Sequence, residues 1–181
     1  EKQYKLCGIQ NDIDIAADDP RRPAFDANRQ AEIEAVKPVI ERLKETGWTF
    51  GSHTWGHIRL DSRPLESVQR DTVRWAEEVG SLVGPTNILF YPHGGRPDGD
   101  DWHSTGPVFQ YLQSQGFRIF ASVGINSFSY IKKDISAVIC DRLHPDGTTL
   151  RNGKALEWYS QFYDAREIID LDVRPDLGVT W

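Results

Sequence analysis

Two histidines stand four residues apart in the segment Ser52-His53-Thr54-Trp55-Gly56-His57. Neutral imidazoles are strong ligands for zinc and related divalent ions, and a catalytic zinc site takes three protein ligands and leaves a position open. We therefore predict that His53 and His57 are two of the ligands of such a site and that the metal is zinc. The same spacing also arises among histidines that share no site, so the surrounding elements must decide.

The residues before this pair follow a pattern of helix and then strand. Apolar side chains recur at helical spacing over residues 33–43, and Gly47 is of a type that commonly ends helices. Trp48-Thr49-Phe50 then indicates a short buried strand. His53 and His57 would follow this strand, at the edge of an α/β sheet where ligands and catalytic groups collect.

The rest of the chain continues the alternation. An alternation of strands and helices predicts a parallel sheet with covering helices, and we expect one α/β domain over residues 1–181. The other predicted strands are 4–10, 87–91, 117–123, 137–140 and 168–171, and the other predicted helices are 65–82, 108–115 and 154–163.

Composition excludes some classes of function. The net charge of −6 argues against a nucleic-acid partner, because phosphate contacts need clustered lysine and arginine. No stretch has the length and apolarity of a membrane span or the pattern of a signal peptide. Cys7 and Cys140 both fall in apolar runs and predict two buried thiols rather than a disulfide. The oligomeric state is not indicated by any pattern.

Two segments resemble motifs of a known enzyme family. Residues 43–57 are similar to the second motif of the NodB-homology polysaccharide deacetylases, carbohydrate esterase family 4, in which a glycine-led strand precedes a His-Ser/Thr-x-x-His metal clamp. Residues 88–95, Ile-Leu-Phe-Tyr-Pro-His-Gly-Gly, are similar to the third motif in its Phe-Ala-Tyr-Pro-Tyr-Gly form. The motifs stand in the family's order and distance, and the resemblance covers residues 1 to 125.

This resemblance implies a fold, a reaction and a location. The fold would be a distorted or incomplete (β/α) barrel of the NodB-homology type. The reaction would be metal-dependent hydrolysis of N-acetyl groups from an amino-sugar polysaccharide or oligosaccharide, in the cell envelope or outside the cell. Chitin-like, peptidoglycan-like and exopolysaccharide substrates all stay open.

The resemblance also implies roles for residues outside the histidine pair. The backbone N–H of Tyr91 would contact an oxyanion, and His93 stands where the family has an aromatic residue that lines the acetyl pocket. Trp102 would stack on a sugar ring or else serve packing, and His144 would act as general acid or else be a turn residue.

The family's first motif, a strand that ends in Thr-Phe-Asp-Asp, is not found. That motif supplies a metal-binding carboxylate and the catalytic base. Asp12 and Asp14 form the only acidic cluster at a strand exit before the histidines, so either can supply the third ligand or belong to a polar turn. Otherwise the domain is truncated at its N-terminus, and the isolated segment is expected to have weak or no deacetylase activity.

Two alternative functions follow from the missing motif. A domain that lacks the carboxylates can serve as a non-catalytic carbohydrate-binding domain on the same fold. A domain in which Asp12 or Asp14 completes the site would be a different metallohydrolase.

Overall fold

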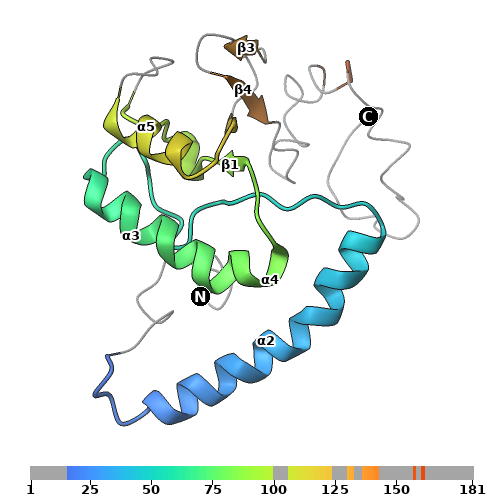
Figure 1. The fold of residues 1–181 in the computed structure, drawn as a ribbon, viewed down its shortest axis with the longest axis vertical. Helices are drawn as coiled ribbons and strands as arrows, with labels where there is room; N and C mark the ends of the chain where they lie inside the picture. Colours follow the sequence, from blue (N-terminus) through green and yellow to red (C-terminus); the bar gives the residue numbers. More distant parts are fainter. Residues whose placement is uncertain are drawn as a thin grey trace.

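The computed structural model describes residues 16–99, 106–123, 130–132, 136–142, 157 and 160–161. Figure 1 shows a small sheet with helices packed beside it and one long helix that runs away from it. The helices are α2 (Arg22–Glu45), α3 (Leu65–Trp75), the π-helical turn η2 (Ala76–Gly80), α4 (Ser81–Val83), the 3₁₀ turn η3 (Pro92–Gly94) and α5 (Pro107–Ser114), and the strands are β1 (Ile88–Phe90), β2 (Ile119–Val123), β3 (Tyr130–Lys132) and β4 (Ala137–Arg142).

The four strands lie in the order β1-β2-β4-β3. Strands β1, β2 and β4 are parallel, and β3 pairs with β4 in the antiparallel direction. Ser52 forms an isolated parallel bridge with Leu89, so the segment before His53 joins the sheet beside β1. The α/β class is confirmed by this arrangement. The barrel and the single-domain extent over residues 1–181 stay predictions.

The core lies between the sheet and helices α3 and α5. Phe120 of β2 is fully buried and stacks on Phe109 of α5 with ring centroids 4.7 Å apart. Asp98 fixes the start of α5, because its two carboxylate oxygens accept the backbone N–H groups of Val108 at 3.0 Å and Phe109 at 2.8 Å. Gly116, with φ +98, follows the helix and lets the chain turn into β2.

Helix α2 is largely exposed, and Ile40 is its one buried residue. Pro38 lies inside the helix without ending it. Figure 1 shows α2 as the long blue helix that extends away from the sheet. Among the residues that the structure describes, no helix is both long enough and apolar enough to cross a membrane.

The expected strand at Trp48-Thr49-Phe50 is wrong. Trp48 is 67% exposed, and the segment has no ladder partner until the single bridge of Ser52. The carbonyl of Phe50 instead accepts the hydroxyl of Thr86 at 2.7 Å. A short apolar run predicts a buried strand only where a neighbouring strand pairs with it. Here the hydroxyl of Thr86, rather than a neighbouring strand, bonds to the main chain of the run.

Strand β3 was not among the strands predicted from the sequence. Cys140 is a free, half-buried cysteine in β4. Cys7, the predicted strands 4–10 and 168–171, and most of the predicted helix 154–163 lie outside the described residues.

Replacing Thr86 with valine tests the contact that joins the 50s segment to β1. The Thr86 hydroxyl donates to the Phe50 carbonyl and accepts the Ile88 N–H at 3.1 Å, and valine keeps the shape but loses both bonds. We expect a loss of about 1–3 kcal/mol in the free energy of unfolding, measured by urea denaturation. Thr46→Val is the control, because its hydroxyl bonds only to nearby carbonyls at the exposed end of α2. Equal losses in both variants would contradict the expectation.

Candidate functional site

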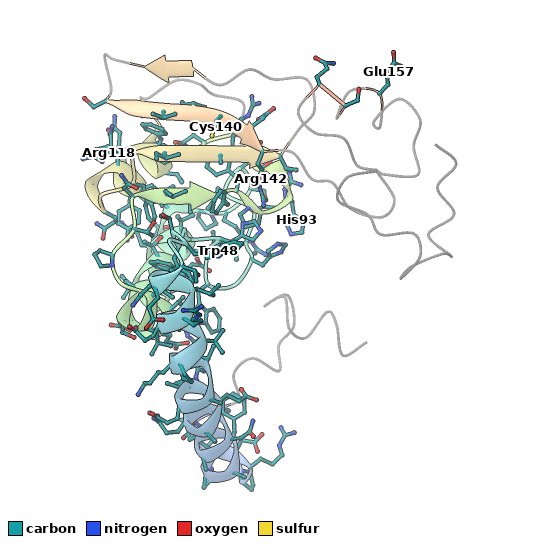
Figure 2. All side chains as sticks on the ribbon, turned by 90° about the vertical axis from the view of Figure 1, so that its right-hand side faces the viewer. Trp48, His93, Arg118, Cys140, Arg142 and Glu157 are labelled. Carbon is teal, nitrogen blue, oxygen red and sulfur yellow. The ribbon has the colours of Figure 1, made fainter. Side chains whose placement is uncertain are left out.

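The carboxyl ends of the parallel segments bring several chemically active side chains to one edge of the sheet. His53 follows the bridge of Ser52, His93 follows β1, and Arg142 ends β4. Figure 2 shows His93 and Arg142 at this end of the sheet and Arg118 at the opposite end. This is the edge at which the sequence places the histidine pair, and it is where open α/β sheets bind ligands.

Three imidazole rings lie next to one another at this edge. The ring centroids of His53 and His57 are 4.8 Å apart, and those of His57 and His93 are 4.6 Å apart, both in edge-to-face contact. The two histidines predicted as ligands therefore lie side by side, and His93 lies next to them. Metal binding by the pair stays a prediction.

The ring of His53 is fixed by its contact with β1. Its Nδ1 lies 2.8 Å from the carbonyl oxygen of Phe90, and because a carbonyl can only accept, Nδ1 must carry the proton. In the neutral ring Nε2 then keeps its lone pair, the arrangement found in metal-binding histidines. Burial lowers the pKa of His53, and the nearby Arg142 and His93 lower it further. The bond to the Phe90 carbonyl acts in the opposite direction and raises this pKa, but burial is the larger effect.

The surroundings of His57 also favour its neutral form. Burial lowers the pKa of His57, and the neighbouring His53, His93 and Arg142 act in the same direction. Its Nδ1 is buried and has no hydrogen-bond partner within the described part of the chain. A neutral ring with an unused buried nitrogen is suited to metal ligation, because such a nitrogen otherwise costs free energy.

The donor set is incomplete among the residues with described positions. Across the described ranges, no group of three or more His, Cys, Asp or Glu side chains is arranged to hold a metal ion. Neighbouring imidazoles are the kind of donor that zinc-like ions bind, and a third ligand is not found in these ranges. The predicted site residues Asp12, Trp102 and His144 lie outside the described residues.

The main chain between the two histidines is tightly turned. Ser52 Oγ accepts the N–H of Thr54 at 3.2 Å, and Thr54 Oγ1 accepts the N–H of Ile58 at 3.0 Å. Thr54 and His57 have φ of 60 and 51, in the left-handed region that non-glycine residues seldom adopt. Such a conformation persists only where surrounding contacts hold it.

Tyr91 is a core residue, which corrects its predicted role at the substrate. Its side chain is 3% exposed and lies near Phe120, with ring centroids 6.3 Å apart. Its backbone N–H donates to the carbonyl of Ala121 at 2.8 Å, so this N–H is not available to an oxyanion. Burial raises the pKa of the Tyr91 phenol. His93, in contrast, is exposed at the edge, and its predicted contact with substrate stays a prediction.

Arg142 lies at the same edge and was not predicted from the sequence as a candidate site residue. Its guanidinium donates to the carbonyl of Tyr91 at 3.2 Å and lies 5.5 Å from the centre of the Phe90 ring. Its Nε is buried without a hydrogen-bond partner among the described residues, and burial lowers the pKa of Arg142. The sequence feature that could have indicated Arg142 is its position just after the predicted strand 137–140, where ligand-binding residues of α/β sheets gather.

Comparison with known families gives one finding. The sequence profile of the family described as polysaccharide deacetylase matches residues 24–117, just over half of the 181-residue chain. The matched range contains His53, His57 and His93. No curated protein and no solved structure matches the chain.

Proposed function

Because this chain belongs to the polysaccharide deacetylase family, we propose that it is a metal-dependent hydrolase that removes N-acetyl groups from an amino-sugar polysaccharide. The observation that supports this most is the pair of neighbouring imidazoles at the carboxyl edge of the sheet, where burial lowers the pKa of both and so favours their neutral form. The family implies a carbohydrate substrate, and we propose that the protein acts on it in the cell envelope or outside the cell.

In this proposal His53 and His57 hold a divalent metal ion, and zinc is the metal that we expect. When bound, such an ion polarises a carbonyl group and lowers the pKa of water. The Phe90 carbonyl orients the His53 ring for this task through the bond to Nδ1. Asp12 remains the carboxylate that the sequence offers as a third ligand.

The neighbouring side chains would orient the substrate and stabilise charge. His93 lies exposed beside His57, where it can contact the sugar or its acetyl group. The half-buried Arg142 guanidinium places its positive charge so that it acts on both histidines, and we propose that it stabilises the acetyl oxygen as that oxygen becomes negative. His144 is proposed to donate a proton to the leaving amine, and Trp102 to stack on a sugar ring.

Removal and return of metal test this function. The full chain, purified and treated with a chelator, should release no acetate from an N-acetylglucosamine oligomer, and added zinc or cobalt should restore release. The restoration is expected because hydrolysis of an amide at neutral pH needs the activation that the ion supplies. Metal binding without acetate release, together with retention on a glycan column, would instead support the carbohydrate-binding alternative. Full activity in the presence of the chelator would contradict the proposal.

A further inference from the structure

We propose that Asp71 is a positioning residue, whose carboxylate holds the main chain between His53 and His57 and so keeps the two rings side by side. This inference rests on the proposed function, since it concerns the same metal site. Asp71 lies on α3, outside the two histidine-bearing segments, and is not itself close enough to be counted with them as a metal-binding group.

The contact consists of two hydrogen bonds to successive backbone N–H groups. Asp71 Oδ1 accepts the N–H of Trp55 at 2.9 Å, and Oδ2 accepts the N–H of Gly56 at 2.7 Å. Gly56 directly precedes His57, so both bonds act on the chain that carries the second ring. Asp71 is only 9% exposed, and hydrogen bonds to a charged group in such a place are strong.

A carboxylate is the side chain that this position requires. Both oxygens of an aspartate accept, whereas an asparagine would present an NH₂ donor to one of the two N–H groups. Burial raises the pKa of Asp71, and the bonds from Gly56 and Trp55 oppose that rise by favouring the charged form. The buried carboxylate is thus compensated by the loop that it holds.

The approach of the loop to α3 is close. A Cβ atom on Gly56 would lie 3.2 Å from Asp71 Oδ2, so a larger residue would push the carboxylate away. The glycine therefore permits the short bonds, and the bonds in turn support the left-handed φ of 51 at His57.

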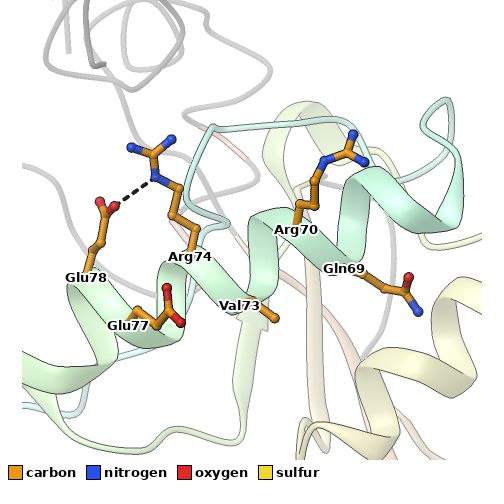
Figure 3. Close-up of a pocket in the computed structure, with 6 residues that line it drawn as sticks. All are labelled: Gln69, Arg70, Val73, Arg74, Glu77 and Glu78. Atoms are coloured by element: carbon orange, nitrogen blue, oxygen red, sulfur yellow. Dashed lines mark hydrogen bonds and ion pairs between the residues drawn. The ribbon is translucent and has the colours of Figure 1, made fainter. Parts of the chain in front are cut away.

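A second contact holds the other side of the same loop. The indole Nε1 of Trp55 donates to Glu78 at 2.6 Å, and the guanidinium of Arg74 lies 3.7 Å from the centre of the Trp55 ring. Figure 3 shows Arg74 and Glu78 side by side on consecutive turns, joined by their ion pair, and Glu78 also pairs with Arg29 of α2. Helix α3 and η2 therefore hold Trp55 by its side chain, while Asp71 holds its main chain.

The test compares Asp71→Asn with Asp98→Asn. Asp98 makes the same kind of contact, two carboxylate oxygens to two successive N–H groups, but at the start of α5. Zinc affinity of the full-length chain would be measured by calorimetry. We expect Asp71→Asn to bind zinc about 10–100-fold more weakly, the loss typical of residues that orient metal ligands, and Asp98→Asn to bind it as the wild type does. Asp71→Glu, which keeps both acceptors, should recover part of the affinity.

A second measurement does not depend on metal. In NMR spectra of the metal-free protein, Asp71→Asn should change the imidazole signals of His57, whereas Asp98→Asn should leave them unchanged. If wild type and Asp71→Asn bind zinc equally and their His57 signals coincide, the inference on Asp71 is overturned while the proposed function stands. If the wild type binds no zinc but Asp71→Asn alone alters the His57 signals, Asp71 positions the ring and the proposed function fails.

Discussion

His57→Ala is expected to lower acetate release from an N-acetylglucosamine oligomer by at least about 10²-fold, because metal activation is worth several kcal/mol and needs both imidazoles. The variant should also lose bound zinc, measured by metal analysis after dialysis. The fold should survive, since His57 is only half-buried and its Nδ1 makes no hydrogen bond with the described residues. Thermal unfolding of the variant provides that check.

His93→Ala is the informative comparison for this prediction. The His93 ring lies as near to His57 as the His53 ring does, but it is exposed and belongs to the turn after β1. A substrate contact predicts that His93→Ala keeps its zinc and shows a raised KM. Loss of zinc in His93→Ala, with zinc retained in His53→Ala, would show that the ligand pair is His57 and His93 and that the ligand assignment is wrong.

Some elements could be predicted because local sequence determines them. The apolar run 117–123 follows Gly116, whose φ of +98 suits glycine, and it contains β2. The predicted helix 108–115 corresponds to α5, which buries Val108, Phe109 and Leu112 at helical spacing. In both cases the apolar pattern and its boundary residues agree, so the local signal was sufficient.

The incorrect prediction for Tyr91 shows what a local sequence motif does not reveal. Side chains of a strand alternate between its two faces, so Tyr91 continues the face of Leu89, which is 1% exposed, while Phe90 points to the other face. The motif resemblance gives the order of these residues but not which face meets the core. The predicted contact used the backbone N–H of Tyr91, and pairing beside β2 gives that N–H to the Ala121 carbonyl instead.

The roles of Asp71 and Arg142 depend on tertiary packing. Asp71 is a polar residue in an amphipathic helix, and only the packing of α3 against the histidine loop gives its carboxylate two N–H partners. Arg142 reaches the site because β4 lies beside β2 with Ala121 opposite Cys140. Strand order and register join residues far apart in sequence, and local patterns of residue type do not reveal them.

Arg142→Gln is expected to lower kcat by about 10²–10³-fold with little change in KM, because the guanidinium is proposed to stabilise charge that develops only in the transition state. Glutamine retains a side-chain donor for the Tyr91 carbonyl, so the variant removes mainly the positive charge. Arg142→Lys keeps the charge without the planar fork and should recover only part of kcat. Steady-state kinetics of acetate release at saturating zinc would give both parameters.

Arg118→Gln provides the matched control, since it also removes one arginine charge but at the opposite end of the sheet (Figure 2). Arg118 is exposed and donates to the carbonyls of Gln113 at 2.6 Å and Phe117 at 2.7 Å, so its loss should leave kcat unchanged. Equal kcat values for Arg142→Gln and Arg118→Gln would show that Arg142 only supports the Tyr91 carbonyl. A raised KM with unchanged kcat would instead mean that Arg142 binds the glycan equally in its ground and transition states, because uniform binding affects KM alone.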